Sequence, residues 1–173
     1  MESNGGSNGG NSTQYDLAGY DLLTPAIRDL MDSYPGLDSG ETFSFSMLEA
    51  EYGQAIFPIS GAIVQYERES ITGHVEQMCL YPFTVVLRVS GQTENRKANA
   101  KEWLDTLGRW LEMQTVIIGD TSYKLSEYPE LNGDAKIMDI SRTTPAYLSM
   151  TNADMSEDWV ISIQARYRNE FDR

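Results

Sequence analysis

The sequence predicts an α+β fold: a mostly antiparallel sheet with a long projecting β-hairpin, packed on two helices. Residues 83–89 and 159–167 place apolar side chains at every second position, which is the period of a half-buried strand. Between them, residues 94–113 carry Trp and Leu at helical spacing along one stripe. Because both periods occur within one stretch of chain, we expect a helix laid against a sheet.

The chain is expected to divide into a flexible N-terminal arm, residues 1–19, and a single α+β domain, residues 20–173. The arm is rich in Gly, Ser and Asn and offers little apolar surface to offset the entropy lost on ordering. An arm that becomes ordered against a neighbouring subunit is the alternative. With 173 residues, the chain is long enough to bury a sizeable core.

A helix and a strand are predicted at the start of the domain. Thr24 is a good N-cap and Pro25 suits the first helical position, while the Tyr-Pro-Gly turn at 34–36 predicts the end of this helix. Apolar and other residues alternate over 43–48, which predicts a first strand. A Gly and a Pro predict a loop or a broken strand over 50–60.

An extended β-hairpin is predicted next, with a strand over 63–69, a turn at 71–73 and a returning strand over 74–90. Pro82 cannot donate to a ladder, so we expect a bulge or a switch to a sheet edge there. The outer part, around 66–78, is rich in charge and is expected to project from the body. A neighbouring subunit would stabilise it, because a lone hairpin is marginal in water.

The remaining elements follow from the same patterns. A turn leads into a helix over 94–113, and Val and Ile residues at 116–118 predict a short strand. Another strand is expected around 137–140, followed by a connecting loop over 145–155. The last strand is predicted over 159–171, which completes an antiparallel sheet covered by helices.

The charge balance restricts the partners that this surface can bind. The chain has 13 Lys and Arg against 26 Asp and Glu, a formal net charge of −13. Such a surface repels phosphate backbones and anionic lipids, so neither tight nucleic-acid binding nor membrane adhesion is expected. The single cysteine, Cys79, is expected to be a small buried hydrophobe, and a chain without an intrachain disulfide is typical of a reducing compartment.

Few side chains suit catalysis or metal binding, so we expect no catalytic residue, no cofactor and no metal. The single histidine, His74, is predicted near the hairpin tip as an ordinary titrating surface group. His74 and Cys79 point to opposite faces of one strand, which does not suit zinc. Two acidic groups are interpreted as solvated surface: Glu49 with Glu51, and Asp154 with Glu157 and Asp158.

Candidate subunit-interface residues come from the hairpin and from the last strand. Charged side chains and a Tyr, a residue type common at interfaces, gather on the outer part of the hairpin. Two arginines alternate with core residues on the last strand, which predicts either a wet face with scattered charge or a basic strip that meets a neighbour's acidic surface. The candidates are Tyr66, Glu67, Arg68, Glu69, His74, Glu76, Arg166 and Arg168.

Four stretches, taken in order, carry a likeness to a known class of protein. A helix ends in a Pro-Gly turn at 30–37, a hairpin leads into YPFTVVLRVSG, a Trp-containing helix reads KEWLDTLGRWLEMQ, and the last strand reads WVISIQARYRNEF. Together they cover most of residues 20–171. This order and spacing resembles the minor capsid and tail terminator proteins of long-tailed bacteriophages, although the Gly- and Asn-rich leader is not part of the resemblance.

The resemblance implies a homo-oligomeric ring, with a hexamer expected, at the head-proximal end of a phage tail tube. Such a ring stops tube polymerisation and joins the tail-tube protein to the head connector in the neck of the virion, after assembly in the cytoplasm of the bacterial host. DNA would pass through an acidic lumen without specific binding. The alternatives are a tail-tube or head-completion protein of the same virion and, in another class, a small acidic ligand-binding or hydrolase domain or an acidic mimic of nucleic acid.

Overall fold

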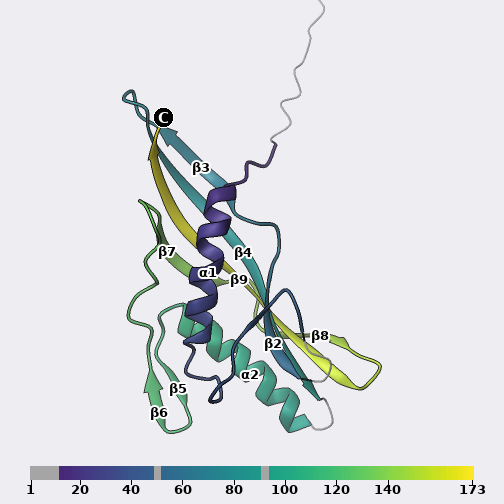
Figure 1. The fold of residues 1–173 in the computed structure, drawn as a ribbon. Coiled ribbons are helices and arrows are strands. Elements are labelled where there is room, and N and C mark those ends of the chain that lie inside the picture. The colour runs from purple at the N-terminus through teal and green to yellow at the C-terminus, as the bar shows by residue number, and fades with distance from the viewer. Residues whose placement is uncertain (1–11, 49–51, 91–93) are drawn as a thin grey trace, which may run out of the picture.

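The computed structural model describes residues 12–48, 52–90 and 94–173. Within these ranges, two helices lie on one face of a mostly antiparallel sheet of seven strands, with a small two-stranded sheet beside them (Figure 1). The predicted α+β class is confirmed. The elements are α1 (Leu17–Asp32), β1 (Ser44–Phe45), β2 (Gly53–Pro58), β3 (Ile63–Glu69), β4 (His74–Ser90), α2 (Glu94–Leu111), β5 (Val116–Ile118), β6 (Thr121–Tyr123), β7 (Lys136–Arg142), β8 (Tyr147–Thr151) and β9 (Ser156–Asp172).

The sheet is built around β4 and β9, two antiparallel strands of 17 residues each that pair along their whole length. On the outer side of β4, β3 pairs with the first half and β2 with the second half. On the outer side of β9, β8 pairs with the first half and β7 with the second half. One end of the sheet therefore runs β3–β4–β9–β7, and the other end runs β2–β4–β9–β8, with β1 parallel to β2 at its margin.

The core lies between this sheet and the two helices. Most odd-numbered residues of β4 and β9, among them Phe83, Val85 and Ile161, are buried on the face that the helices cover, which we call the covered face. Both helices bury one apolar stripe against it, as expected for amphipathic helices. These stripes comprise Leu23, Ile27 and Met31 of α1 and Leu104, Leu107 and Leu111 of α2.

The predicted start of the first helix is wrong. α1 begins at Leu17, and its N-cap is Asp16, whose Oδ1 accepts a hydrogen bond from the Gly19 N–H at 2.9 Å. Pro25, expected at the first helical position, lies inside the helix. The apolar stripe continues on both sides of Pro25, and its burial against the sheet outweighs the local penalty of an interior proline.

The predicted boundary at residue 20 also comes too late. The Asp16 N–H donates to the carbonyl of Ala62 at 3.0 Å, and Tyr15 forms a β-bridge with Ile63. Residues 12–19 therefore belong to the folded domain, although they are too polar for a sequence pattern to reveal this. Residues 1–11 of the predicted arm lie outside the described residues.

Three predictions on the strands need correction. Residues 50–60, expected as a loop or a broken strand, contain β2, because its Gly and Pro stand at the two ends of the strand. Residues 145–155, expected as a loop, contain β8. The first strand, expected over 43–48, is only two residues long, because the backbone turns at Ser46, where φ is 54°.

The hairpin of β3 and β4 is confirmed, and its outer part is not a lone ribbon. β9 runs beside β4 up to the tip, where His74 pairs with Asp172 and the Arg173 N–H donates to the Gly73 carbonyl at 3.0 Å. This end of the sheet therefore stabilises itself without a neighbouring subunit. β4 shows no bulge at Pro82, which lies where the outer neighbour of β4 changes from β3 to β2.

Candidate assembly surfaces

All eight predicted interface residues lie at one end of the sheet, where β3, β4 and β9 run side by side (Figure 1). Opposite residues of an antiparallel pair share a face, so the register assigns each candidate to one side of the sheet. Glu67 and Glu69 lie on the covered face, opposite Gln77 and Val75. The other six share the opposite face: Tyr66, Arg68, His74, Glu76, Arg166 and Arg168.

The two arginines of the last strand are engaged within their own chain. The Arg166 Nε donates to Asp139 Oδ2 of β7 at 2.7 Å, and the Arg168 Nε lies 2.9 Å from Glu170 Oε1. Of the two hypotheses for this strand, these contacts favour a wet face with scattered charge over a free basic strip. Exposed pairs of this kind contribute little to stability.

His74 lies at the surface and forms an ion pair across the central ladder when protonated. Its Nδ1 lies 2.9 Å from Asp172 Oδ1, and its Nε2 lies 3.8 Å from Glu170 Oε2. The hydrogen bond with Asp172 and the surrounding carboxylates raise the pKa of His74 above its ordinary value. The predicted titrating surface group is therefore present with a perturbed pKa.

A second cluster of charge joins the C-terminus to the hairpin. The Arg173 guanidinium donates to Glu67 and to Glu69, both at 3.0 Å. The Gln77 side-chain amide also donates to Glu67 at 2.6 Å. These contacts connect β3, β4 and the residue after β9, so these charges are paired within the chain.

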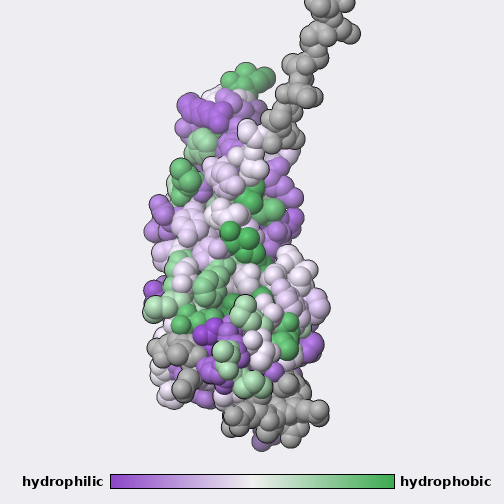
Figure 2. Space-filling model, turned by 90° about the vertical axis from the view of Figure 1, so that its right-hand side faces the viewer, coloured by the Kyte–Doolittle hydropathy of each residue, from purple (hydrophilic) through white to green (hydrophobic). Residues whose placement is uncertain are grey.

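The face of the sheet turned away from the helices carries apolar side chains between its charges. We call it the open face, and it comprises the even-numbered residues of β4 and β9 and the residues opposite them. Its apolar members on β4 are half-buried: Met78, Leu80, Pro82 and Val86. Both helices lie on the other side of the sheet (Figure 1). On the side of the molecule seen in Figure 2, hydrophobic patches likewise alternate with hydrophilic residues.

Two of the sheet edges are protected by contacts that the sequence did not reveal. Along β3, the Val64 N–H donates to the Gln14 carbonyl at 2.9 Å. Along β7, the Ile140 N–H donates to the Tyr128 hydroxyl at 3.2 Å, and the Arg142 N–H donates to Glu112 Oε1 at 2.9 Å. Such caps occupy backbone donors that could otherwise pair with another chain.

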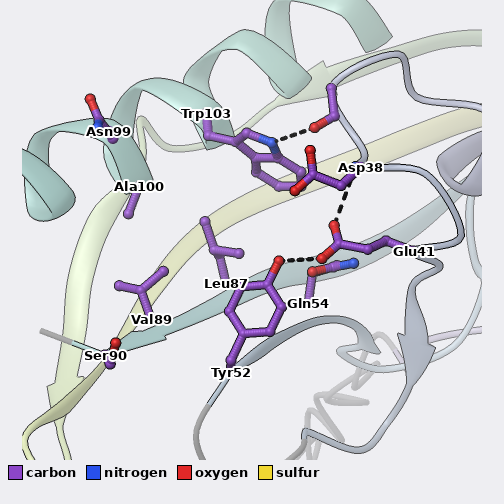
Figure 3. A pocket seen from close by; sticks show the side chains of 11 residues that line it. Asp38, Glu41, Tyr52, Gln54, Leu87, Val89, Ser90, Asn99, Ala100 and Trp103 are labelled. Carbon is purple, nitrogen blue, oxygen red and sulfur yellow. Dashed lines mark hydrogen bonds between the residues drawn. The ribbon is translucent and has the colours of Figure 1, made fainter.

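A cleft of about 480 Å³ opens between the N-terminal half of α2 and the loop after α1 (Figure 3). Trp103, Tyr52 and two carboxylates line it, and their polar groups are engaged with one another. The Trp103 indole N–H donates to the Gly36 carbonyl at 2.9 Å, and Tyr52 donates to Glu41, which raises the pKa of Tyr52 to about 12. No local sequence signal marks this cleft, because four separate segments contribute to it.

In the second acidic group only Asp154 is exposed, whereas Glu157 and Asp158 are buried, contrary to the prediction of a solvated surface. Asp158 accepts two hydrogen bonds from Arg88, Nε to Oδ1 at 2.7 Å and Nη2 to Oδ2 at 2.8 Å. Glu157 is buried and accepts from the Trp159 indole N–H at 3.2 Å. A bidentate arginine allows an acidic side chain to be buried. The other predicted group, Glu49 with Glu51, lies outside the described residues.

Cys79 is fully buried, as predicted, and burial raises the pKa of its thiol to about 11. Among the described residues, no three His, Cys, Asp or Glu side chains are grouped to hold a metal ion. Neither described helix has both the length and the apolar character needed to cross a bilayer.

No known protein family matches this chain, and no curated protein has a significantly similar sequence.

Proposed function

We propose that this protein is a structural subunit of a phage virion, a tail terminator that forms a ring at the head-proximal end of the tail tube and joins it to the head connector. The proposal starts from the sequence resemblance. The observation that supports it best is the open face, where the sheet carries apolar residues and no described helix covers it. Exposed apolar surface rimmed by polar groups is typical of an interaction site.

The exposed apolar residues extend this surface to both ends of the sheet. Tyr66 lies on the open face at the β3 end, and Tyr147 and Met150 lie on it at the β8 end, all of them more than a third exposed. These are residue types that are enriched where proteins meet. A subunit that associates with copies of itself would remove this surface from water.

The two ends of the sheet differ in chemistry, which suits a ring. One end carries the exposed ion pairs of β3, β4 and β9, and the other carries the uncharged strand β8 beside the largely buried pair of Arg88 and Asp158. A ring forms when one patch of each subunit meets a different patch of the next, and the rotation closes. A molecule with two unlike ends can make such a contact, whereas a two-fold dimer uses the same patch twice.

The net charge of −13 is consistent with a ring through which DNA passes. Binding of duplex DNA depends mainly on neutralising its phosphates with Lys and Arg, which release counterions. A lumen formed by this acidic chain would repel the phosphates and allow the duplex to slide. The proposed partners are a second copy of the chain, the tail-tube protein and the head-connector protein.

Electron microscopy of the full chain, alone and added to purified tails that lack their terminator, tests the proposal. We expect closed rings of uniform subunit number, either in solution or at one end of each tail. Long cylinders would contradict a terminator and support the tail-tube alternative. A chain that stays monomeric at every concentration and does not bind tails would contradict the proposal.

A further inference from the structure

β8 is an edge strand that exposes apolar side chains to solvent. Its sequence, YLSMT, contains no charged residue, and all five of its residues are exposed. The exposed fractions are 45% for Tyr147, 41% for Leu148 and 57% for Met150. The strand and its turn extend away from the helices at one end of the molecule (Figure 1). A solvent-facing strand of this size normally carries polar or charged side chains.

Each face of β8 carries an exposed apolar side chain. Tyr147 lies opposite Val160 on the open face, whereas Leu148 lies opposite Trp159 on the covered face. An antiparallel strand with one wet face is expected to alternate between apolar and polar residues, and a strand that is apolar on both faces is typical of a sheet that is covered on both sides. Met155, in the turn that follows, is 59% exposed and extends the apolar surface. β8 therefore has the composition of a strand whose two faces are covered.

The outer edge of β8 also lacks the protection that the other edges have. The β3 edge is occupied by residues 14–16 and carries Glu and Arg, and the β7 edge is capped by Tyr128 and Glu112. In the part of the chain that the structure describes, no hydrogen bond joins the outer side of β8 to any other segment. β8 has no Lys, no Pro and no inward charge, and although its pairing with β9 shifts register between Leu148 and Met150, the residues on either side of the shift remain open to strand addition.

We propose that β8 takes up a sheet-edge strand from a second copy of this chain, and that this pairing is one of the contacts that hold the assembly together. The proposal rests on the proposed function, because it supplies one of the two unlike patches that a ring requires. The backbone groups on the outer side of β8 would pair with the incoming strand, and Tyr147, Leu148 and Met150 would become buried on either side of it.

The absence of charge on this strip allows a second copy of the chain to bind there. Two molecules with a net charge of −13 repel each other, so they can associate only where acidic side chains are absent. The run from residue 143 to residue 153, which contains β8, has no charged residue and is exposed along the strand. A foreign partner selected by charge would need charged groups on this strip, and the strip has none.

The first test introduces charge on the edge. The double variant L148K/M150K should weaken self-association of the full chain by about 100-fold or more, because a charged edge strand disfavours strand addition. The matched control is I117K, which places the same charge on an exposed apolar residue of β5 and should leave self-association within about twofold of the original chain, as expected for a residue outside an interface. Mass photometry measures both, and circular dichroism checks that the variants are folded.

The second test uses the unmodified chain and does not depend on the variants. Hydrogen exchange is measured on dilute and on concentrated protein, and the amides of residues 147–151 should become protected as the protein associates. An assembly that forms normally while these amides exchange freely would overturn the β8 proposal and leave the ring intact. A chain that forms no rings, either in solution or on purified tails, would overturn both proposals. Protection that appears with tail-tube protein while the chain remains monomeric would overturn the assignment to a second copy.

Discussion

At the scale of single residues, His74 gives the clearest pH dependence because it is the only histidine in the chain. Its pKa lies above the ordinary value of 6.5, mainly through the hydrogen bond with Asp172. A raised pKa means that the protonated form stabilises the fold. This contribution is complete below pH 6.5 and is lost as the pH rises through the raised pKa.

We predict that D172N lowers the pKa of His74 toward 6.5, because it removes the carboxylate that favours the imidazolium. NMR titration of the single imidazole measures this directly. The exposed Asp134, far from the hairpin tip in sequence, provides the control, since D134N should leave the titration unchanged. A His74 that titrates at 6.5 in the unmodified chain would show that the ion pair does not form in solution.

Gly19 shows how close packing can require one residue type. A Cβ at this position would lie 2.1 Å from Asp16 Oδ2 and 2.1 Å from the Tyr167 hydroxyl, which hydrogen-bond each other at 2.6 Å. We predict that G19A lowers the free energy of unfolding by about 1–3 kcal/mol through overpacking, even though Ala favours helix over Gly by about 1 kcal/mol. Denaturant unfolding measures the change.

The matched control for G19A is A18S, an exposed substitution in the same turn of α1, which should have a small effect. Y167F removes the hydroxyl that the added methyl group would meet, so the double variant G19A/Y167F should lose less than the sum of the two single changes. If G19A is as stable as the original chain, the contact among Asp16, Gly19 and Tyr167 is looser than the structure indicates.

The arginines of β9 show which properties of single residues can be predicted from sequence. The sequence correctly indicated that Arg166 and Arg168 alternate with core residues, because a strand has a period of two. It could not reveal that Asp139 and Glu170 neutralise them, since Asp139 reaches Arg166 only through the pairing of β7 with β9. For the same reason, Asp158 was interpreted as solvated although Arg88 of β4 binds it.

At the scale of elements, the edge of β7 depends on side chains from two other segments. The Tyr128 hydroxyl donates to the Leu111 carbonyl at 2.8 Å and accepts from the Ile140 N–H at 3.2 Å. We predict that Y128F lowers the free energy of unfolding by about 1–3 kcal/mol, because a partly buried donor and an acceptor lose their partner. The amide of Ile140 should also exchange faster with solvent. The control is Y123F, an exposed tyrosine of β6, which should change neither quantity.

Glu112 joins α2 to β7 and should make the fold sensitive to acid. Burial disfavours its charge, but three hydrogen bonds from Arg142, each 2.9 Å, outweigh burial and lower the pKa of Glu112 below its ordinary value of 4.5. A lowered pKa means that the ionised form stabilises the fold. The contribution is complete above pH 4.5 and is lost as the pH falls through the lowered pKa.

We predict that E112Q costs about 1–3 kcal/mol of stability at neutral pH, as expected for hydrogen bonds to a charged group. The difference from the original chain should shrink as the pH falls below 4.5, and denaturant unfolding over a pH series measures it. E127Q changes an exposed carboxyl nearby in sequence and serves as the control. A difference that stays constant with pH would mean that the charge of Glu112 is not what stabilises the contact.

Some strands were predicted accurately from the sequence and others were missed, for a physical reason. β3 and β4 have the predicted bounds because long alternating runs carry a strong local signal. β2 and β8 were missed as strands because they are short and bounded by Gly, Pro or polar residues. Pairing with β4 and β9 makes them strands, and that pairing has no local signature.

At the scale of the whole molecule, charge should control assembly. Copies with a net charge of −13 repel each other, and salt screens this repulsion over a Debye length that falls from about 20 Å to about 6 Å between about 0.02 and 0.3 M salt. We predict that self-association strengthens severalfold over this range, since the proposed β8 contact contains no charged residue. Analytical ultracentrifugation measures it, with the monomeric L148K/M150K variant as the baseline. Association that weakens with salt would point instead to ion pairs at the charged end of the sheet.

The sequence by itself determined the α+β class, the two helices, the long hairpin and the identity of most core residues. Each of these follows from a period in hydrophobicity, which depends only on neighbours along the chain. Only the tertiary structure decided which segments lie side by side, because strand register is set by contacts between residues far apart in sequence. The pairing of β9 with β4 over 17 residues brought the predicted interface residues together, and the absence of a partner beyond β8 in the described chain left an apolar edge exposed.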